Sequence, residues 1–229
     1  MSADAKPDQW LIVFDCDGVL VDTEALANKR LAELVTQAGL PMTYEQSRAR
    51  FVGMSLKSIR TLLLDEDGVD LGSDFAEHWQ QSLPEIFAQP VPAIDGIHEA
   101  LDAIERAGHT VCVASSGTVN KMRLTLGSAG LWDRLSGVLF SADMVARGKP
   151  APDLFWHAAA TMGHAPQHCI VIEDSPFGAQ AAHAAGMACF GYAADPLTNV
   201  TQLAEQGAML FDDMAKLPGL IEAHIKQSH

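Results

Sequence analysis

Residues 11–22, which read LIVFDCDGVLVD, constrain the fold more than any other stretch of the chain. Residues 11–14 form a continuous apolar run with β-branched members, and this pattern predicts a short strand buried on both faces of a parallel sheet. Asp15 and Asp17 follow that strand directly, with Gly18 next to them. Two carboxylates at the end of a buried strand are costly to desolvate unless something compensates their charge. A hard divalent cation such as Mg²⁺ is the usual compensation, because it prefers oxygen ligands.

The pattern D-x-D-G taken alone leaves two other interpretations open. An acidic turn after a strand is the simplest of them. A calcium loop of the EF-hand type is the other, but that loop requires glycine at its sixth position, where Leu20 stands. In the complete pattern, further apolar residues and a third acid, Asp22, follow the glycine. That combination is much rarer than its parts and favours a dedicated site.

Residues 24–93 have the apolar spacing of helices, and no segment among them has a convincing strand pattern. Thr43 and Gln46 have the spacing of a capping box at the start of one helix, as do Asp74 and Glu77 at the start of another. Two prolines and an Asp-Gly turn end the segment. The sequence therefore predicts an all-helical insertion, with four helices, as a separate domain.

From residue 97 onward, predicted helices alternate with predicted strands. Strands are expected at residues 110–114, 138–140, 169–172, 187–192 and 208–211, and helices at 97–104, 119–129, 153–162 and 176–185. Regular alternation of this kind predicts an α/β fold with a Rossmann-like, doubly wound parallel sheet. The predicted core domain is discontinuous and comprises residues 1–23 and 94–229.

The composition excludes several classes of partner. The chain has 229 residues and a formal net charge of -14, so it offers no basic surface for nucleic acid or for an anionic membrane. No apolar run approaches membrane-spanning length, and residues 1–10 lack the apolar region of a secretion signal. The four cysteines are scattered without a C-x-x-C pair, which is typical of buried, reduced thiols. We expect a cytoplasmic monomer or weak homo-oligomer whose partner is a small molecule.

Polar side chains follow four of the predicted strands. In open α/β sheets the carboxyl ends of the strands form one edge, and ligands bind there. Each group by itself has a plain explanation as a turn, a surface charge or an acid pair at a helix start. Together they predict one site with two acidic loops for a metal, a hydroxyl beside backbone donors, and one cation. The residues are Asp15 and Asp17, Ser115, Ser116 and Gly117, Lys149, and Glu173 and Asp174.

In order and spacing these residues resemble the four motifs of the haloacid dehalogenase superfamily of phosphotransferases, whose first motif reads D-x-D-G-x-x-x-D. The resemblance covers nearly the whole chain, and the helical insertion is similar to the four-helix C1 cap of that superfamily. Residues 172–175, IEDS, and residues 148–153, GKPAPD, are similar to the forms of the β-phosphoglucomutase and sugar-phosphate phosphatase subgroup. The resemblance implies a phosphoric monoester hydrolase.

The resemblance also implies a role for each motif residue. Asp15 is the expected nucleophile, which forms an aspartyl-phosphate. Asp17 is the expected general acid for the leaving alcohol and then the base for the hydrolytic water. The first role requires a raised pKa, which a closed and desolvated site could supply. The groups expected to hold the phosphoryl oxygens are Ser115, the N–H of Ser116, Gly117 and Lys149.

The implied cofactor is Mg²⁺. Its implied ligands are the Asp15 carboxylate, the Asp17 backbone carbonyl and Asp174, with Glu173 either ligating the ion or orienting water. The Lys149–Pro150 bond, beside this site, is a candidate for the cis form.

The loop at residues 51–58 is expected to face the active site and to contact the leaving group. Gly53 and Lys57 from this loop, and Asn120 after the second strand, are the expected substrate contacts. Solvation at the surface is the alternative for each basic or polar side chain. Further candidates are Arg48, Arg50 and Lys121. The expected substrate is a small phosphorylated sugar, a sugar acid such as 6-phosphogluconate, or a polyol phosphate.

The resemblance allows four other functions. Dehalogenases and phosphonate hydrolases of the superfamily lack the acid that Asp17 supplies. β-Phosphoglucomutases, the main alternative, typically carry His where Ala27 stands, Trp at Leu31 and Arg at Leu56, although Lys57 could replace the Arg. A non-catalytic binding protein is less favoured, because it should have lost one of the motif residues.

Overall fold

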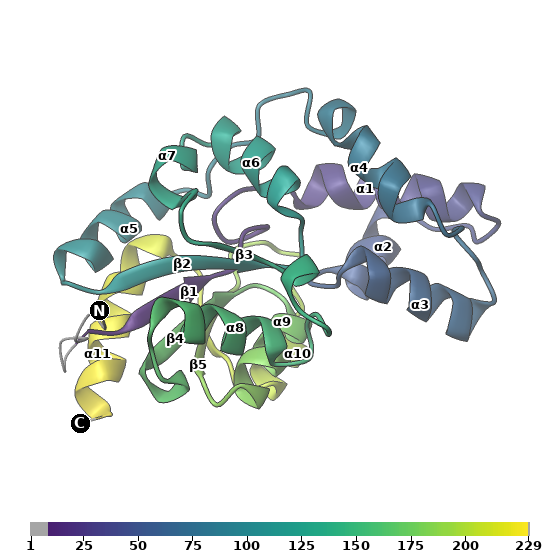
Figure 1. Ribbon diagram of the computed structural model, residues 1–229. Coiled ribbons are helices and arrows are strands. Elements are labelled where there is room, and N and C mark those ends of the chain that lie inside the picture. The colour runs from purple at the N-terminus through teal and green to yellow at the C-terminus, as the bar shows by residue number, and fades with distance from the viewer. Residues whose placement is uncertain (1–8, 229) are drawn as a thin grey trace.

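Six parallel strands form the central sheet of the computed structural model, which describes residues 9–228 (Figure 1). The strands are β1 (Leu11–Phe14), β2 (Thr110–Ser115), β3 (Leu139–Ser141), β4 (Cys169–Glu173), β5 (Ala188–Tyr192) and β6 (Met209–Phe211). Their order is β3-β2-β1-β4-β5-β6, and every neighbouring pair is parallel. The predicted doubly wound α/β fold is confirmed. The order of connection reverses between β1 and β4, which is where such sheets bind ligands.

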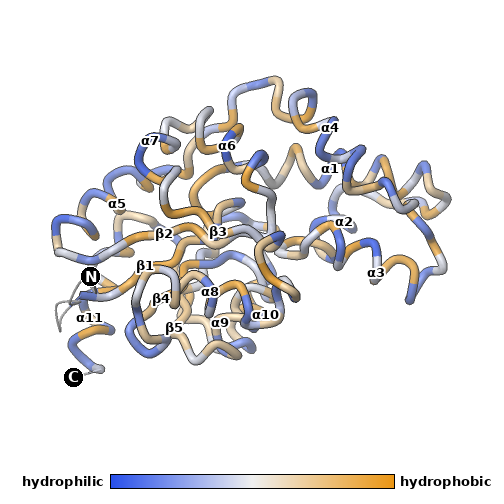
Figure 2. The backbone as a smooth tube through the Cα atoms, in the orientation of Figure 1, coloured by the Kyte–Doolittle hydropathy of each residue, from blue (hydrophilic) through white to orange (hydrophobic). Residues whose placement is uncertain are grey.

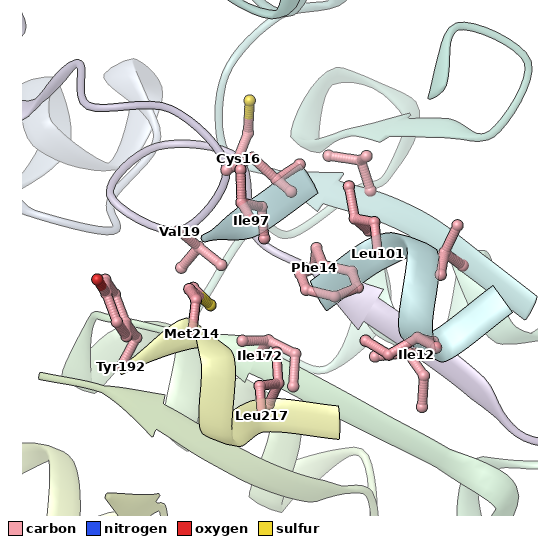
Figure 3. Packing of buried hydrophobic residues seen from close by; sticks show 14 of the residues in the cluster. Ile12, Phe14, Cys16, Val19, Ile97, Leu101, Ile172, Tyr192, Met214 and Leu217 are labelled. Carbon is pink, nitrogen blue, oxygen red and sulfur yellow. The ribbon is translucent and has the colours of Figure 1, made fainter. Parts of the chain in front are cut away.

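Helices cover both faces of this sheet. One face carries α5 (Ile97–Arg106), α6 (Val119–Ser128), α7 (Trp132–Leu135) and α11 (Leu217–Gln227), and the other carries α8 (Asp153–Met162), α9 (Pro176–Ala184) and α10 (Val200–Glu205). Alternate residues of β1 supply the two cores, since Ile12 and Phe14 face α5 and α11 whereas Leu11 and Val13 face α8 and α9. Figure 3 shows the first of these cores, in which Phe14 lies beside Leu101 and Ile172 near Leu217. All four residues of β1 are buried, as the apolar run predicts.

Four helices lie between β1 and α5 and extend to one side of the sheet (Figure 1). They are α1 (Glu24–Gln37), α2 (Tyr44–Phe51), α3 (Leu56–Asp67) and α4 (Phe75–Ile86). Their buried residues, among them Leu31, Phe51, Leu63 and Trp79, form a hydrophobic cluster distinct from the two cores of the sheet. Figure 2 shows apolar stretches concentrated in the central strands, while these helices alternate apolar and polar segments. We call this four-helix unit the cap.

Two short segments connect the cap with the sheet, and they lie side by side. Asp22 donates its backbone N–H to the Pro92 carbonyl at 3.0 Å, and Ile94 donates to the Leu20 carbonyl at 3.0 Å. Val21 also forms an isolated antiparallel bridge with Ala93. The chain therefore leaves and re-enters the core at one place, next to the loop that carries Asp15 and Asp17.

Some details differ from the expectation. The capping box at Thr43 is confirmed, but Asp74 makes no side-chain capping bond. Helices α7, α10 and α11 were not predicted, since short or weakly amphipathic helices give little periodic signal. The expectations about residues 1–8, including the missing secretion signal, lie outside the described residues. Within residues 9–228, no helix has both the length and the apolar character that a bilayer crossing requires.

Candidate functional site

Lys149 and three carboxylates form a buried cluster at the carboxyl ends of β1 and β4. The Lys149 side chain is fully buried, and its Nζ donates to Asp15 Oδ1 at 2.5 Å, to Glu173 Oε1 at 2.6 Å and to the Ala114 carbonyl at 3.0 Å. Asp174, also buried, completes the cluster beside Asp15 and Glu173. The peptide bond between Lys149 and Pro150, which the sequence made a candidate for the cis form, is cis. One ammonium therefore pairs with two carboxylates from two different strand ends, and a third carboxylate lies beside them.

This surplus of acids shifts the pKa values of Asp15 and Lys149. Burial is the main reason that the pKa of Asp15 is raised to about 7, because the charge of Lys149, which lowers it, is opposed in turn by the charges of Glu173 and Asp17. Burial by itself lowers the pKa of Lys149, but the charges of Asp15 and Glu173 outweigh it and hold that pKa above its usual value. Lys149 is thus a fixed cation, and the remaining negative charge calls for a proton or a metal ion.

The carboxylates fit a hard divalent cation. Ligand oxygens of Asp15, Glu173 and Asp174 all lie within 4.8 Å of one another. The second oxygen of Glu173 accepts from the backbone N–H groups of Asp174 and Ser175, each at 3.0 Å, which fixes the orientation of the carboxylate. Gly18 lets its loop approach Asp174, because a Cβ at that position would lie 2.1 Å from the Asp174 Oδ2. Oxygen donors of this kind suit Mg²⁺.

We expect Mg²⁺ to raise the unfolding temperature of the protein, because it binds the native carboxylates and not the unfolded chain. At a hundredfold excess over the dissociation constant, the stabilisation is about 2.7 kcal/mol. Thermal unfolding monitored by circular dichroism with and without Mg²⁺ measures it. Asp174→Asn should lose most of the shift, whereas Asp143→Asn, an exposed acid that also lines the cavity described below, should keep it. An equal shift in both variants would contradict the assignment of the cluster.

Asp17 lies outside this cluster and has its own partners. Its Oδ1 lies 2.8 Å from the Nζ of Lys121 and accepts a hydrogen bond from the Thr23 hydroxyl. Burial by itself raises the pKa of Asp17, but the charge of Lys121 and the hydrogen bonds from Lys121 and Thr23 outweigh it and hold the pKa below its usual value. The expected raised pKa is therefore wrong for this state of the protein, in which Asp17 is an anion. The Asp17 backbone carbonyl as a metal ligand stays a prediction.

The serine turn after β2 faces Asp15 and Asp17 from the adjoining strand. The Ser115 hydroxyl accepts from the N–H of Gly117 at 3.0 Å, and the Gly117 carbonyl accepts from the Ser141 hydroxyl at 2.8 Å. Thr118 then caps α6 by accepting from the N–H of Lys121 at 3.2 Å. These bonds hold the turn at the entrance to a helix N-terminus, where backbone N–H groups favour a bound anion.

The cap closes over these groups and leaves a cavity of about 880 Å³ between cap and core. The Gly53 carbonyl accepts from the Ser116 hydroxyl at 2.8 Å, and Gln80 Oε1 accepts from Thr118 at 3.0 Å. The predicted site residues that line the cavity are Asp15, Asp17, Gly53, Lys57, Ser115, Ser116, Gly117, Lys121, Lys149 and Asp174. Glu173 lies beneath it as a partner of Lys149.

Three candidates lie elsewhere. Asn120 is exposed on α6 and does not line the cavity, so its role in substrate binding stays a prediction. Arg48 on α2 pairs with Asp195 of the core at 2.6 Å, which ties the cap to the loop after β5. Arg50 pairs with Glu66 and Asp67 within the cap.

Sequence reasoning missed several contacts around the cavity. Thr23, Gln80 and Trp79 were not singled out, and the pairing of Lys121 with Asp17 was not foreseen. A capping threonine before α6 is visible in the sequence, but the partner of Lys121 depends on how α6 packs against the β1 loop. No local pattern reports that.

We expect Gly53→Ala to lower kcat/KM by more than about tenfold while the fold persists. Gly53 has φ +82°, and a Cβ there would lie 2.2 Å from the Ser175 hydroxyl, so the cap loop would have to withdraw from the core. Strain at positive φ alone costs roughly 1–2 kcal/mol. Gly68→Ala in the same cap isolates that cost, because Gly68 has φ +67° and nothing within 4 Å of an added Cβ. Equal losses of activity in the two variants would contradict a role in cap closure.

Comparison with known proteins agrees with this geometry. Residues 12–192 match the family model of haloacid dehalogenase-like hydrolases. The chain is 32% identical over 213 residues to the 6-phosphogluconate phosphatase of Escherichia coli (strain K12), which covers 93% of this chain and 94% of the relative. It is 30% identical over 177 residues to hexitol phosphatase A of the same organism, with coverage of 76% and 78%. Among solved structures, a conserved haloacid dehalogenase-like protein of unknown function from Agrobacterium tumefaciens superimposes with a TM-score of 0.74 at 33% identity. That match covers 94% of this chain and 99% of the other.

Proposed function

The chain belongs to the haloacid dehalogenase-like hydrolase family and is a phosphoric monoester hydrolase, and we propose that it removes phosphate from a small phosphorylated sugar acid, sugar or polyol with the help of Mg²⁺. The observation that carries this proposal is the contact of Asp15 with the buried Lys149 at the floor of a cavity lined by the serine turn. A nucleophile, a fixed cation and phosphate-binding donors there face one space.

The first half-reaction uses Asp15 and Asp17. A carboxylate oxygen of Asp15 attacks phosphorus, the bond to the ester oxygen breaks, and the leaving alkoxide takes a proton from Asp17. Asp17 is an anion in the substrate-free protein, so it must acquire that proton before or during substrate binding. Lys149 and the Ser115–Gly117 turn stabilise the negative charge on the phosphoryl oxygens.

The second half-reaction regenerates the enzyme. Water loses a proton to Asp17 and attacks the phosphorus of the aspartyl-phosphate, which releases inorganic phosphate and restores Asp15. Mg²⁺, held by Asp15, Asp174, the Asp17 carbonyl and Glu173 directly or through water, would supply charge neutralisation at the phosphate and keep Asp15 ionised.

The substrate class rests on the relatives and on the cavity. The two relatives described above are named 6-phosphogluconate phosphatase and hexitol phosphatase A, and both names refer to small polyhydroxy compounds. A cavity of about 880 Å³ has ample room for a molecule of that size. The cap wall at Ala27, Leu31 and Leu56 is apolar, so it lacks the His and Arg of a β-phosphoglucomutase.

We assign residues 24–93 to a cap domain and residues 1–23 and 94–229 to the core domain, on the basis of the separate hydrophobic cluster of the cap. Four buried free cysteines fit a reducing compartment, and we place the enzyme in the cytoplasm as a monomer or weak homo-oligomer.

Phosphate release from a panel of sugar, sugar-acid and polyol phosphates, with Mg²⁺ and with EDTA, tests the function. We expect release that requires the metal and selects a few compounds. The panel includes β-glucose 1-phosphate with catalytic glucose 1,6-bisphosphate. Formation of glucose 6-phosphate without phosphate release would overturn the phosphatase and establish the mutase.

A further inference from the structure

Lys121 differs from the other basic side chains that line the cavity. Lys149 is buried in the acidic cluster below the phosphate site. Arg147 lies at the rim, where 68% of its side chain is exposed, and Lys57 is exposed on the cap. Lys121, by contrast, lies on α6, outside the cap, and lines the cavity with only 13% of its side chain exposed. It is therefore a cation held in a largely desolvated place.

Contacts on several sides fix the position of the Lys121 ammonium. Its Nζ lies 2.8 Å from Asp17 Oδ1 and 5.9 Å from the centre of the Phe87 ring. Its aliphatic stem passes close to the serine turn, because a Cβ on Gly117 would lie 3.2 Å from the Lys121 Cδ. A larger residue at position 117 would push the stem aside. These contacts hold the Lys121 ammonium in place before a substrate binds.

The partner of Lys121 places it on the leaving-group side of the cavity. Asp17 protonates the ester oxygen in the proposed mechanism, and Lys121 touches that same carboxylate. Only a carboxyl group and two hydrogen bonds separate the ester oxygen from the ammonium, which is roughly 5–8 Å. A group at the far end of a short sugar chain lies at a comparable distance from its own phosphate ester.

We infer that Lys121 is a specificity-determining residue that binds a second anionic group of the substrate, the carboxylate of a phosphorylated sugar acid, while it stays beside Asp17. An ammonium has three N–H donors and can hold both carboxylates at once. This inference rests on the proposed phosphatase function and narrows its substrate class from sugar phosphates in general to sugar-acid phosphates.

Charge explains why this contact selects its substrate. The chain has a net charge of -14, and Asp143, Glu77 and Asp174 also line the cavity, so a substrate carboxylate is repelled unless a local cation receives it. A hydroxyl at the same place needs no such cation and gains less from one. A charge-assisted hydrogen bond of this kind changes binding by about 10- to 100-fold.

The test compares 6-phosphogluconate with sorbitol 6-phosphate, which replaces the carboxylate by a hydroxymethyl group and keeps the rest of the chain. We expect wild-type kcat/KM to favour 6-phosphogluconate by at least about tenfold. In Lys121→Met the ratio should fall toward one, while Lys121→Arg should keep most of it. Changing Lys121 also affects its neighbour Asp17, but the resulting loss of kcat/KM is common to both substrates and cancels in their ratio.

Arg123→Met is the matched control, because it removes the same charge from an exposed position two residues further along α6, outside the cavity lining. It should leave the ratio unchanged. Equal kcat/KM for the two substrates in the wild-type protein overturns the inference without any variant, as does a ratio that survives Lys121→Met. If neither compound and no other member of the panel released phosphate, the proposed function itself would be overturned.

Discussion

Asp15→Asn should lower kcat/KM for every phosphate ester by more than about 10⁴-fold, the scale on which enzymes lose activity without their nucleophile. An amide nitrogen or oxygen does not attack phosphorus to form the acyl phosphate, and no other carboxylate takes its place. Glu173 is fixed by Lys149 and by the backbone of the next loop, and Asp17 is held by Lys121 and Thr23. Phosphate release measured with a sensitive dye, with the wild-type enzyme as reference, gives the ratio.

The same substitution should leave the fold intact. Asp15 belongs to a cluster of three carboxylates, two of which pair with Lys149, so replacing it by an amide removes repulsion as well as a partner of Lys149. The unfolding temperature without metal should therefore not fall by more than a few degrees. Turnover that survives in a folded Asp15→Asn protein would remove Asp15 as nucleophile.

Stability against pH gives an independent view of the same carboxyl group. In the metal-free protein burial raises the pKa of Asp15 from 3.8 to about 7. Between these values the folded protein binds a proton that the unfolded chain has released, so the free energy of unfolding falls as pH rises from about 4 to about 7. Denaturant unfolding in EDTA at several pH values measures this slope. The slope should be smaller in Asp15→Asn. An unchanged slope would show that other groups cause the pH dependence.

The strand ends were predictable because their signals are local. Each buried run of apolar residues stops at a polar group, and parallel strands place those groups along one edge. The sequence therefore predicts that Asp15, Ser115, Lys149 and Glu173 belong to one site. The family motif gave their expected roles, and the contact of Lys149 with both Asp15 and Glu173 agrees with it.

Contacts between elements that are distant in the chain were not predictable. Arg48 was a candidate for substrate binding, but it is buried against Asp195, 147 residues away, and serves the junction of cap and core. The pKa of Asp17 could not be read from burial alone, because the direction depends on Lys121 lying within hydrogen-bonding distance. The charge of Lys121 and the hydrogen bonds from Lys121 and Thr23 together outweigh desolvation there, and a sequence does not state which neighbours a side chain will have.

Asp17→Asn should act very differently on two kinds of ester. The leaving alkoxide of a sugar phosphate is strongly basic and needs a proton as the bond to phosphorus breaks, whereas nitrophenolate leaves without one. General acid catalysis contributes about 10²–10⁴-fold. We therefore expect kcat/KM for the sugar phosphate to fall by that factor and kcat/KM for p-nitrophenyl phosphate to fall by less than about tenfold. The amide can still accept the Thr23 hydrogen bond, so the loop should keep its place.

The second role of Asp17 separates the two half-reactions in the same variant. Without a base for the hydrolytic water, the aspartyl-phosphate should accumulate after p-nitrophenolate has left, so rapid mixing should show a burst that approaches one equivalent per site, followed by a slow steady state. The wild-type enzyme serves as the reference for the size of the burst. Equal losses of kcat/KM on both esters would show that Asp17 does not protonate the leaving group. A slow steady state without a burst would mean that Asp17→Asn mainly slows the attack by Asp15. That result would contradict the proposed roles of the two aspartates.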